Sequence, residues 1–350
     1  MKGLILSGGH GTRLRPITYS QQKQLIPVAN KPILFYAIED VIEAGAKEIG
    51  IIVGPNKEQV IETVRSRTWE AEIEFIIQDK PKGLAHTVLI AEHFLDDDFV
   101  MYLGDNILRE GIVDHARKFR ENNHDASIML TEVPDPEQFG IAALNENGTI
   151  KQLVEKPKDP PSNLALVGIY FFKPSIIEAC KSIKPSWRDE LEITDAIQWL
   201  IDHGYNVGWT KVQDWWKDTG KPEDILEANR LVLDCIESKN EGIEEDTRIM
   251  GRVVIESDVR LTNSVVKGPA LIGRGSIINK SYIGPYTSIG DSCVIEDTEI
   301  EDSIVMERTE IIGGGRLIES LVGKEVKIRR KADFPNGRRL IIGDHSEVVG

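Results

Sequence analysis

Hydrophobic residues follow two different patterns along the chain, and the change falls near residue 240. Before it, short and almost continuous apolar runs alternate with segments of helical period. The apolar runs predict strands at Lys2–Ser7, Glu48–Val53, Ile73–Gln78, Phe99–Leu103 and Ser127–Val133. The helical segments are Ile33–Ala44, Lys57–Ser66, Leu84–Phe94 and Ile112–Asn122. Continuous apolar strands separated by helices predict a doubly wound, Rossmann-like α/β sheet that is covered on both faces.

The pattern loosens after this alternation. Phe139–Leu144 and Thr149–Val154 predict a hairpin, and Leu164–Phe172 predicts a further strand. Helices are expected at Glu190–Asp202 and Glu223–Ile236. We interpret this stretch as an insertion built onto the sheet, where the second part of a substrate would bind.

From about Gly251 the helical period disappears, and small aliphatic residues recur every five or six positions. They are Ile255, Leu261, Val266, Ile272, Ile278, Ile283, Ile289, Ile295, Ile300 and Val305. A fixed short period predicts a solenoid, because each unit cannot bury its apolar face alone. The repeat resembles the hexapeptide-repeat left-handed β-helix, with about four or five coils expected between Val253 and Ile328.

We therefore expect two domains, an α/β domain over residues 1–240 and an all-β left-handed parallel β-helix over residues 241–350. The last stretch, from Arg329 to Gly350, breaks the repeat and contains the turn sequence Pro335-Asn336-Gly337. Because the ends of a solenoid need covering, this stretch is expected to cap the last coil.

Composition excludes several classes of protein. The chain is 41% hydrophobic and 28% charged, as in folded globular proteins, and no apolar run is long enough to span a membrane. Its net charge of −15 argues against binding nucleic acid or an anionic membrane. Three cysteines without a C-x-x-C pair predict neither a disulfide framework nor a zinc site, which favours the cytoplasm. Phosphate-bearing substrates would need local cations, backbone amides or a metal ion.

The sharpest motif directly follows the first predicted strand and reads Leu6-Ser7-Gly8-Gly9-His10-Gly11-Thr12-Arg13-Leu14. Glycines at such a turn let backbone amides approach a phosphate, and Arg13 can bind phosphate through two donors. The spacing fits neither a Walker A loop nor G-x-G-x-x-G. Lys23, in Lys23-Gln24-Leu25-Ile26-Pro27-Val28, adds a second cation. The motif thus predicts a triphosphate-binding loop; the alternative is a structural turn with solvated charges.

Two aspartates are candidates for holding a metal ion. Asp105 ends an apolar strand, at the edge where α/β sheets bind ligands, and Asp218 lies in a Trp-rich turn before a helix. Magnesium binds oxygen ligands, commonly one or two carboxylates together with phosphate oxygens and water. A strand-end cap is the alternative interpretation of Asp105.

Ordered motifs through the first 230 or so residues carry a family resemblance. Besides the glycine-rich loop and Lys23-Gln24-Leu25, they are Gln78-Asp79, Gly83-Leu84-Ala85, Leu103-Gly104-Asp105-Asn106, Phe139-Gly140, Glu155-Lys156-Pro157, Gly168-Ile169-Tyr170, Glu190-Leu191-Glu192-Ile193-Thr194-Asp195 and Trp216-Lys217-Asp218-Thr219-Gly220. The chain resembles the sugar-nucleotide pyrophosphorylase superfamily. Within it, the sequence is similar to the glucose-1-phosphate thymidylyltransferases, in the long form that carries a C-terminal β-helix.

The resemblance implies a role for each matching residue. Nucleotide binding is implied for Leu6, Gly8, Gly9, Gly11, Thr12, Gln78, Gly83 and Asp105. Sugar or sugar-phosphate binding is implied for Asn106, Gly140, Glu155, Lys156, Gly168, Arg188 and Trp216, although Trp216 could equally be a core tryptophan. Asp105 and Asp218 are expected to bind Mg²⁺, and Arg13, Lys23 and Lys156 to act as catalytic cations. Gln78 suits a pyrimidine edge, since its amide offers both a donor and an acceptor.

The expected reaction joins dTTP and α-D-glucose 1-phosphate to give dTDP-glucose and pyrophosphate, by Mg²⁺-dependent in-line attack on the α-phosphate. The choice between dTTP and UTP stays open. One alternative is a bifunctional uridylyl- or thymidylyltransferase with acetyltransferase activity in the β-helix. Another is a non-catalytic protein that binds nucleotide sugars or serves assembly. Because solenoids commonly pack side by side, a homo-oligomer is expected.

Overall fold

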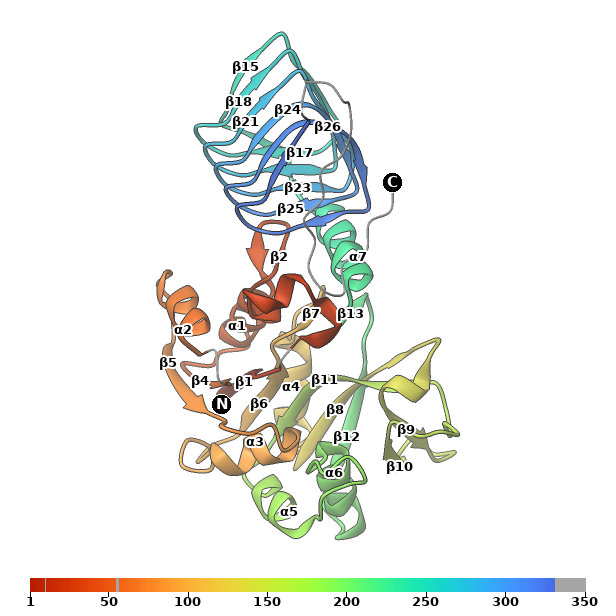
Figure 1. The fold of residues 1–350 in the computed structure, drawn as a ribbon. Coiled ribbons are helices and arrows are strands. Elements are labelled where there is room, and N and C mark those ends of the chain that lie inside the picture. The colour runs from red at the N-terminus through yellow and green to blue at the C-terminus, as the bar shows by residue number, and fades with distance from the viewer. Residues whose placement is uncertain (10, 55–56, 331–350) are drawn as a thin grey trace. The chain divides into compact units, whose positions relative to one another are not determined.

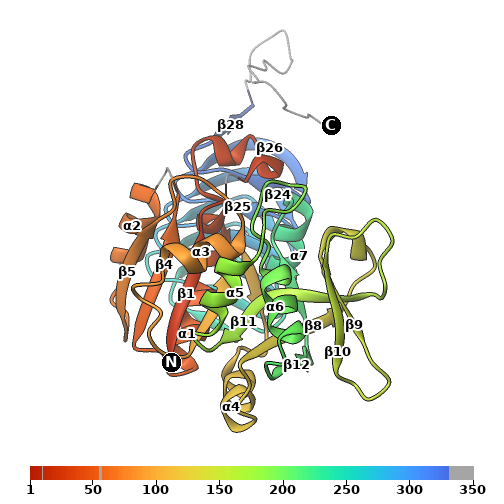
Figure 2. The same ribbon diagram turned by 90° about the horizontal axis from the view of Figure 1, so that it is seen from below.

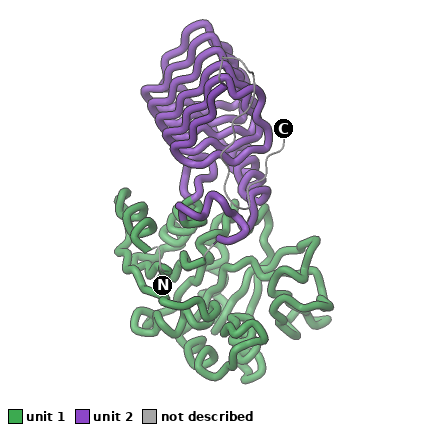
Figure 3. Tube along the Cα trace, in the orientation of Figure 1, with its two compact units in different colours: residues 1–10, 22–25, 33–218 green, residues 11–21, 26–32, 219–350 purple. Residues whose placement is uncertain are grey.

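The computed structural model describes residues 1–9, 11–54 and 57–330, and the chain divides into two compact units (Figures 1 and 3). Unit 1 comprises residues 1–10, 22–25 and 33–218, and unit 2 comprises residues 11–21, 26–32 and 219–350. Two short segments near the N-terminus thus belong to the same unit as the C-terminal repeat. Of the expected C-terminal cap, residues 331–350 lie outside the described residues, and Arg329 is the last residue of strand β28 (Lys327–Arg329).

Unit 1 is built on one mixed sheet, whose main path runs β10-β9-β11-β6-β1-β4-β5, with β8 beside β11 and β12 beside β8. The central strands β1, β4, β5 and β6 are mutually parallel, whereas β11 runs antiparallel to both β6 and β8. The strands are β1 (Lys2–Ser7), β4 (Glu48–Val53), β5 (Glu72–Ile77), β6 (Phe99–Leu103), β8 (Ala126–Glu132), β9 (Gly140–Leu144), β10 (Ile150–Glu155), β11 (Leu164–Phe172) and β12 (Val207–Lys211). The expected α/β doubly wound class is confirmed.

Helices cover both faces of this sheet. On one face lie α1 (Ile33–Glu43), α2 (Lys57–Arg65) and α4 (Val113–Glu121); on the other lie α3 (Leu84–Ile90), α5 (Ile176–Ser182) and α6 (Ile193–Asp202) (Figure 2). In β1, Leu4 and Leu6 enter one core while Ile5 enters the other. Two covered faces explain why this strand is apolar at successive positions. No helix in the described ranges is long and apolar enough to cross a membrane.

The helices are shorter than the sequence pattern predicts, and the structure gives the reason for two of them. α3 ends at Ile90 rather than at Phe94, because the chain turns at Ala91 and inserts Phe94 and Leu95 into the core. α6 begins at Ile193 rather than at Glu190. Two of the three residues before it, Glu190 and Glu192, line the pocket described below.

The repeat in unit 2 forms parallel strands stacked coil on coil, consistent with a left-handed β-helix. One ladder stacks Ile243, Arg260, Ile277, Val294, Glu310 and Lys327. The strands are β14 (Lys239–Asn240), β15 (Ile243–Glu245), β16 (Arg248–Met250), β17 (Val253–Ile255), β18 (Arg260–Thr262), β19 (Val265–Lys267), β20 (Ala270–Ile272), β21 (Ile277–Asn279), β22 (Tyr282–Ile283), β23 (Thr287–Ile289), β24 (Val294–Glu301), β25 (Ile304–Val305), β26 (Glu310–Ile318), β27 (Leu321–Val322) and β28 (Lys327–Arg329).

The stacked strands begin earlier than the hydrophobic period indicates. The first coil comprises β14, β15 and β16, and it pairs in parallel with the coil above it. Its strands are mainly polar and exposed, so the five- or six-residue aliphatic period is missing there. The first coil of a solenoid has only one neighbour and therefore less core to line.

Serine and threonine hydroxyls form hydrogen bonds between successive coils, joining residues that are 17 positions apart in the sequence. Ser281 Oγ donates to the backbone oxygen of Asn279 at 2.7 Å and accepts the backbone N–H of Thr298, 17 residues on, at 3.3 Å. Ser264 likewise accepts the N–H of Ser281 at 3.2 Å, and Ser303 accepts that of Ser320 at 3.0 Å. The repeated serines in the sequence are therefore inter-coil hydrogen-bonding residues at the corners of the solenoid.

Replacing Ser281 by alanine should destabilise unit 2. The side chain is buried, and its loss leaves the Thr298 N–H and the Asn279 carbonyl each without this partner. We expect Ser281→Ala to lower the free energy of unfolding by about 1–2 kcal/mol, measured by denaturant titration. The exposed Ser238→Ala should change it by less than about 0.5 kcal/mol. Equal stability of the two variants would contradict a role for the hydroxyl ladder.

Candidate active site

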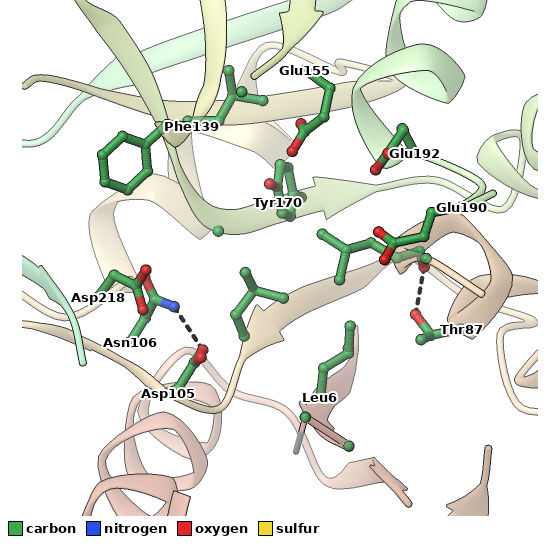
Figure 4. A pocket seen from close by; sticks show the side chains of 18 of the residues that line it. Leu6, Thr87, Asp105, Asn106, Phe139, Glu155, Tyr170, Glu190, Glu192 and Asp218 are labelled. Carbon is green, nitrogen blue, oxygen red and sulfur yellow. Dashed lines mark hydrogen bonds between the residues drawn. The ribbon is translucent and has the colours of Figure 1, made fainter. Parts of the chain in front are cut away.

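A cavity of about 340 Å³ opens in unit 1 at the carboxyl ends of β1 and β6 (Figure 4). Most of the residues expected from the sequence line it: Leu6, Gly8, Gly9, Gln78, Gly83, Asp105, Asn106, Gly140, Glu155, Lys156, Gly168, Arg188, Trp216 and Asp218. These residues come from separate strands and loops that are up to 212 positions apart in the sequence. The fold thus brings the expected nucleotide, sugar and metal residues to one pocket.

The other expected residues are placed differently. Lys23, in the short 3₁₀ helix η3 (Lys23–Leu25), forms an ion pair with Asp105. Gly11, Thr12 and Arg13 belong to unit 2, where Gly11 adopts a left-handed conformation with φ of 58° and precedes η1 (Thr12–Leu14). The Arg13 guanidinium lies against Gly220 of the same unit, so that a Cβ on Gly220 would lie 2.9 Å from Arg13 Nη2.

Asp105 is held as a buried carboxylate. Burial opposes its ionisation, but the Lys23 ammonium and a hydrogen bond from Asn106 outweigh burial, so the pKa of Asp105 lies below its usual range. Asn106 Nδ2 donates to Asp105 Oδ1 at 3.0 Å. Asp105 is therefore charged at neutral pH and fixed in orientation.

A small two-stranded ladder places Asp218 near Asp105. β7 (Asn106–Leu108) pairs antiparallel with β13 (Trp216–Asp218), and the pairing sets Asp218 opposite Asn106. Trp216 Nε1 donates to Asn106 Oδ1 at 2.6 Å, and the Trp216 ring meets Phe139 edge-on at 5.6 Å between ring centres. Figure 4 shows Asp105, Asn106 and Asp218 gathered at one side of the pocket. Trp216 thus lines the pocket and also packs against Phe139, another residue of its wall.

These two carboxylates fit a magnesium ion. No group of three or more histidine, cysteine, aspartate or glutamate side chains suited to a metal occurs within the described ranges. Magnesium needs no such cage, because it commonly takes one or two carboxylates and fills its remaining positions with phosphate oxygens and water. The hard oxygen donors of Asp105 and Asp218 match that preference.

The opposite side of the pocket concentrates carboxylates around one arginine. Arg188 Nη2 pairs with Glu190 at 2.8 Å, and its Nη1 lies 3.4 Å from Glu192 and 3.6 Å from Glu155. Thr194 Oγ1 donates to Glu155 Oε2 at 3.2 Å. Burial, and then the charge of Glu192, raise the pKa of Glu155 above its ordinary value. This side can offer carboxylate acceptors to hydroxyl groups and one guanidinium to a phosphate.

Glycine is required at two points of the wall. Gly83 has a φ of +95°, and a Cβ there would overlap the backbone of Leu191, which accepts a hydrogen bond from the amide of Ala85. A Cβ on Gly140 would lie 2.9 Å from Glu155 Oε2. Both glycines therefore let the loop before α6 and the glutamate side of the pocket approach the sheet closely.

Gln78, the residue expected to read a base, is nearly buried at 8% exposure and is held by a neighbour. Its Nε2 lies 3.0 Å from His86 Nδ1. Burial, and then the charge of Lys82, lower the pKa of His86, so its ring is neutral at pH 7 and Nδ1 can accept from the Gln78 amide. The hydrogen bond fixes the orientation of the Gln78 amide in the pocket.

The structure adds residues to this site that sequence reasoning had not assigned a role. Gln24 lines the pocket at 2% exposure, and its buried Oε1 makes no hydrogen bond among the described residues. An unsatisfied buried acceptor is costly unless a ligand supplies the donor. The only available signal was the position of Gln24 beside Lys23 in the motif. Glu192, whose side chain accepts from Ser186 Oγ at 2.8 Å, was quoted in a motif but given no function.

The site combines a glycine-rich turn after β1, a pair of carboxylates near a strand end and a cluster of carboxylates around an arginine. These features define a class of α/β enzymes that act on phosphorylated substrates. A model of the nucleotidyl transferase family matches residues 2–234, and the chain belongs to that family.

Full-length relatives share nearly half of their residues with this chain. A glucose-1-phosphate thymidylyltransferase of Streptomyces griseus is 48% identical over 99% of each chain. The low-salt glycan biosynthesis nucleotidyltransferase Agl11 of Haloferax volcanii is also 48% identical over 99% of each chain. A crystal structure of a Bacillus anthracis protein in complex with a sucrose matches with a TM-score of 0.62 and 34% identity, covering 68% of this chain and 98% of that one.

The ionised form of Glu155 is expected to lower the stability of the folded protein. Its pKa is raised in the folded state, so the folded protein binds more protons than the unfolded chain between the two pKa values, and stability falls as pH rises through that interval. We expect Glu155→Gln to raise the free energy of unfolding at pH 7, where the carboxylate form is more populated, and to leave it unchanged near pH 3, where the carboxyl is protonated in both states.

Thermal and denaturant unfolding at pH 3, 5 and 7 would measure this difference. The exposed Glu146→Gln serves as the matched control and should show no such dependence on pH. A loss of stability at pH 7 in Glu155→Gln would mean that the attraction of Glu155 to Arg188 outweighs the cost of its burial.

Proposed function

We propose that this chain is a glucose-1-phosphate thymidylyltransferase, which converts dTTP and α-D-glucose 1-phosphate into dTDP-glucose and pyrophosphate. The observation that carries the proposal is one pocket with two different ends: the carboxylates of Asp105 and Asp218 at one, and a cluster of glutamates at the other (Figure 4). The glutamates surround Arg188, and the fixed Gln78 is also part of the pocket lining. The name of the full-length Streptomyces griseus relative supports the choice of nucleotide and sugar.

The nucleotide is assigned to the end near β1. Leu6, Gly8, Gly9, Gly11 and Thr12 would hold the nucleotide by backbone and side-chain contacts, and Arg13 and Lys23 would hold the triphosphate and the departing pyrophosphate. Gln78 and Gly83 would read the pyrimidine edge. Because one Gln78 amide hydrogen is engaged by His86, the remaining hydrogen and the carbonyl oxygen offer a donor and an acceptor to that edge.

The hexose is assigned to the end lined by glutamates. Glu155 would accept sugar hydroxyls, and Gly140 and Gly168 would leave room for the ring. Asn106 and Trp216 would contact the sugar from the side of Asp105 and Asp218. Lys156 and Arg188 would bind the sugar phosphate. Lys156 adopts a left-handed conformation with φ of 43°, held by its N–H bond to the Phe139 carbonyl at 3.0 Å. Backbone strain of this kind occurs where a side chain must be aimed at a ligand.

The chemistry requires positioning and neutralisation of charge. The phosphate oxygen of a sugar 1-phosphate is already an anionic nucleophile, so no general base is needed for attack on the α-phosphorus. A new P–O bond forms to that oxygen while the bond to pyrophosphate breaks in line, and pyrophosphate leaves with the electron pair. Arg13, Lys23 and Lys156 would neutralise the oxygens involved and orient the two substrates.

We propose Mg²⁺ as the cofactor. The residues that line the pocket include five carboxylates (Asp105, Glu155, Glu190, Glu192 and Asp218) and two cations (Lys156 and Arg188). Two polyanionic substrates cannot bind there without added positive charge. When bound, the ion supplies that charge and polarises phosphate oxygens, and Asp105 and Asp218 would hold it.

Two alternatives are less well supported. An acetyltransferase in the β-helix would need a base, and the described coils, residues 239–330, contain no histidine. A purely non-catalytic binding role would not need the carboxylate pair, the strained Lys156 and the fixed Gln78 together in one pocket. Catalysis accounts for all of these features at once.

We further propose a homo-oligomer and a cytoplasmic location. Ile243, Ile277 and Ile318 expose 65%, 46% and 51% of their surfaces on the coils of unit 2, which favours side-by-side packing of β-helices. All three cysteines carry free thiols, as expected in a reducing compartment. Light scattering coupled to gel filtration would measure the mass in solution.

The substrate assignment is tested by pyrophosphate release with Mg²⁺, crossing dTTP, UTP, CTP, ATP and GTP with the 1-phosphates of glucose, N-acetylglucosamine and mannose. We expect the highest kcat/KM for dTTP with glucose 1-phosphate, and little turnover with purine nucleotides, whose base is too large for a site built around Gln78. Comparable turnover of UTP would widen the assignment to pyrimidine nucleotides. No release from any pair would contradict an enzymatic role.

The metal assignment is tested by titrating Mg²⁺ at saturating substrates. Asp218→Asn removes one anionic ligand, so we expect the Mg²⁺ concentration for half-maximal rate to rise by about 10–100-fold. The exposed Asp159→Asn has the same change in charge away from the pocket and should behave as the unaltered protein does. An unchanged Mg²⁺ requirement in Asp218→Asn would remove this residue from the metal site.

A further inference from the structure

One buried asparagine joins three separate parts of unit 2. Asn229 lies in α7 (Pro222–Leu233) and has no exposed surface. Its Oδ1 accepts the backbone N–H of Ala29 at 2.9 Å and the Ser288 hydroxyl at 2.8 Å, and its Nδ2 donates to the Tyr286 carbonyl at 3.0 Å. One side chain therefore links α7, a β-helix coil and a segment from the N-terminal region.

The N-terminal partner is the tip of a small hairpin. β2 (Pro27–Val28) pairs with β3 (Lys31–Pro32), and the two residues between them, Ala29 and Asn30, have φ angles of 47° and 59°. Such angles suit a tight hairpin turn, but they are unfavourable for alanine, which lacks the polar side chain that lets asparagine adopt them. The turn is fixed from outside, by Asn229 at Ala29 and by a 2.6 Å bond from Asn30 Nδ2 to the Ile289 carbonyl.

The β-helix is shaped to receive these contacts. In β23 the side chains of Thr287 and Ile289 face the solenoid core, and that of Ser288, between them, faces outward. Ser288 is nevertheless fully buried, and it donates to Asn229. The next residue of α7 is fixed to another coil, since Arg230 Nε donates to Asp302 Oδ1 at 2.6 Å. Helix α7 is thus clamped to the solenoid at two successive residues.

The same unit contains the arginine that the proposed function assigns to the triphosphate. The Arg13 guanidinium packs against Gly220, two residues before the start of α7. The hairpin, in turn, follows directly on residues 22–25, the segment that contributes Lys23 and Gln24 to the pocket side. Both ends of the stretch from residue 11 to residue 32 are therefore built into the unit that Asn229 holds together.

We propose that Asn229 is a positioning residue for nucleotide binding: by anchoring the hairpin tip and α7 to the β-helix, it sets the parts of the N-terminal segment that belong to unit 2, residues 11–21 with Arg13 and residues 26–32. The inference rests on the proposed function, in which Arg13 holds the triphosphate. It gives the β-helix a part in the reaction besides any part in assembly. Asn229 itself has no role in touching substrate.

The test compares Asn229→Ala, in α7, with Ser276→Ala, which removes buried hydrogen bonds within the coils of the β-helix. Ser276 is also fully buried, donating to the Gly290 carbonyl at 2.8 Å and accepting the Cys293 N–H at 3.0 Å, all within the coils. We expect Asn229→Ala to lower kcat/KM for dTTP roughly ten-fold while KM for glucose 1-phosphate changes less than about two-fold. Ser276→Ala should lose comparable stability and leave both constants unchanged.

A rescue variant separates positioning from folding. Glycine adopts the left-handed conformation of residue 29 without strain, so Ala29→Gly should keep the turn formed when the Asn229 bond is missing. We expect Ala29→Gly combined with Asn229→Ala to recover part of the lost kcat/KM for dTTP. Equal dTTP kinetics in Asn229→Ala and the unaltered protein, or an equal loss in Ser276→Ala, would overturn the proposal.

Hydrogen exchange distinguishes failure of this inference from failure of the proposed function. If the unaltered full-length chain releases no pyrophosphate from any substrate pair, the proposed function fails, but exchange in residues 11–32 can still be measured. Faster exchange across residues 11–21 and 26–32 in Asn229→Ala, absent in Ser276→Ala, is the expected result. Faster exchange confined to the Ala29 amide would overturn the inference, because the anchor would then not reach the segment containing Arg13.

Discussion

The ion pair between Lys23 and Asp105 joins the short segment after the glycine-rich turn to the carboxyl end of β6. Both side chains are largely buried, with 11% and 18% of their surfaces exposed. Neither charge would be tolerable there alone, since removing one partner of a buried pair leaves an uncompensated ion. The position of Lys23 therefore depends on Asp105 at the end of β6, and the charged form of Asp105 depends on Lys23. The proposed metal site and triphosphate site are coupled through this contact.

The surplus of carboxylates in the pocket affects how Arg188 can bind an anionic ligand. In the absence of substrate, Arg188 is surrounded by Glu155, Glu190 and Glu192, so its charge is already neutralised within the pocket wall. In the proposed function, a sugar phosphate would compete with these carboxylates for the guanidinium. Burial, and then the charge of Glu192, raise the pKa of Glu155, and hydroxyl groups that donate to Glu155 would stabilise its charged form.

The sequence pattern predicted β1, β4 and β11 to the residue, because each strand is apolar on two covered faces and ends at a turn. It could not show β7 and β13, whose three-residue pairing joins positions 108 to 112 residues apart in the chain. For the site, residue types and motifs identified about half of the residues that line the pocket, including five of its seven charged side chains. Gln24 was not identified, because its burial and its unsatisfied oxygen result from tertiary packing, which the local sequence pattern does not show. The assignment of residues 11–21 and 26–32 to the C-terminal unit is likewise a property of long-range contacts.

This last feature changes how the two halves of the sequence relate to function. The hydrophobic patterns separate an α/β region from a repeat, which suggests a catalytic part and an appended solenoid. The contacts of Asn229 and Arg230 instead fix α7 to the coils, and those of Ala29 and Asn30 fix the N-terminal hairpin to the same unit. A chain that lacked the solenoid would leave the buried groups of α7 and the hairpin without partners, at about 1–3 kcal/mol for each unsatisfied group. The solenoid therefore supports the N-terminal segment of unit 2, to which the proposed function assigns a part of triphosphate binding.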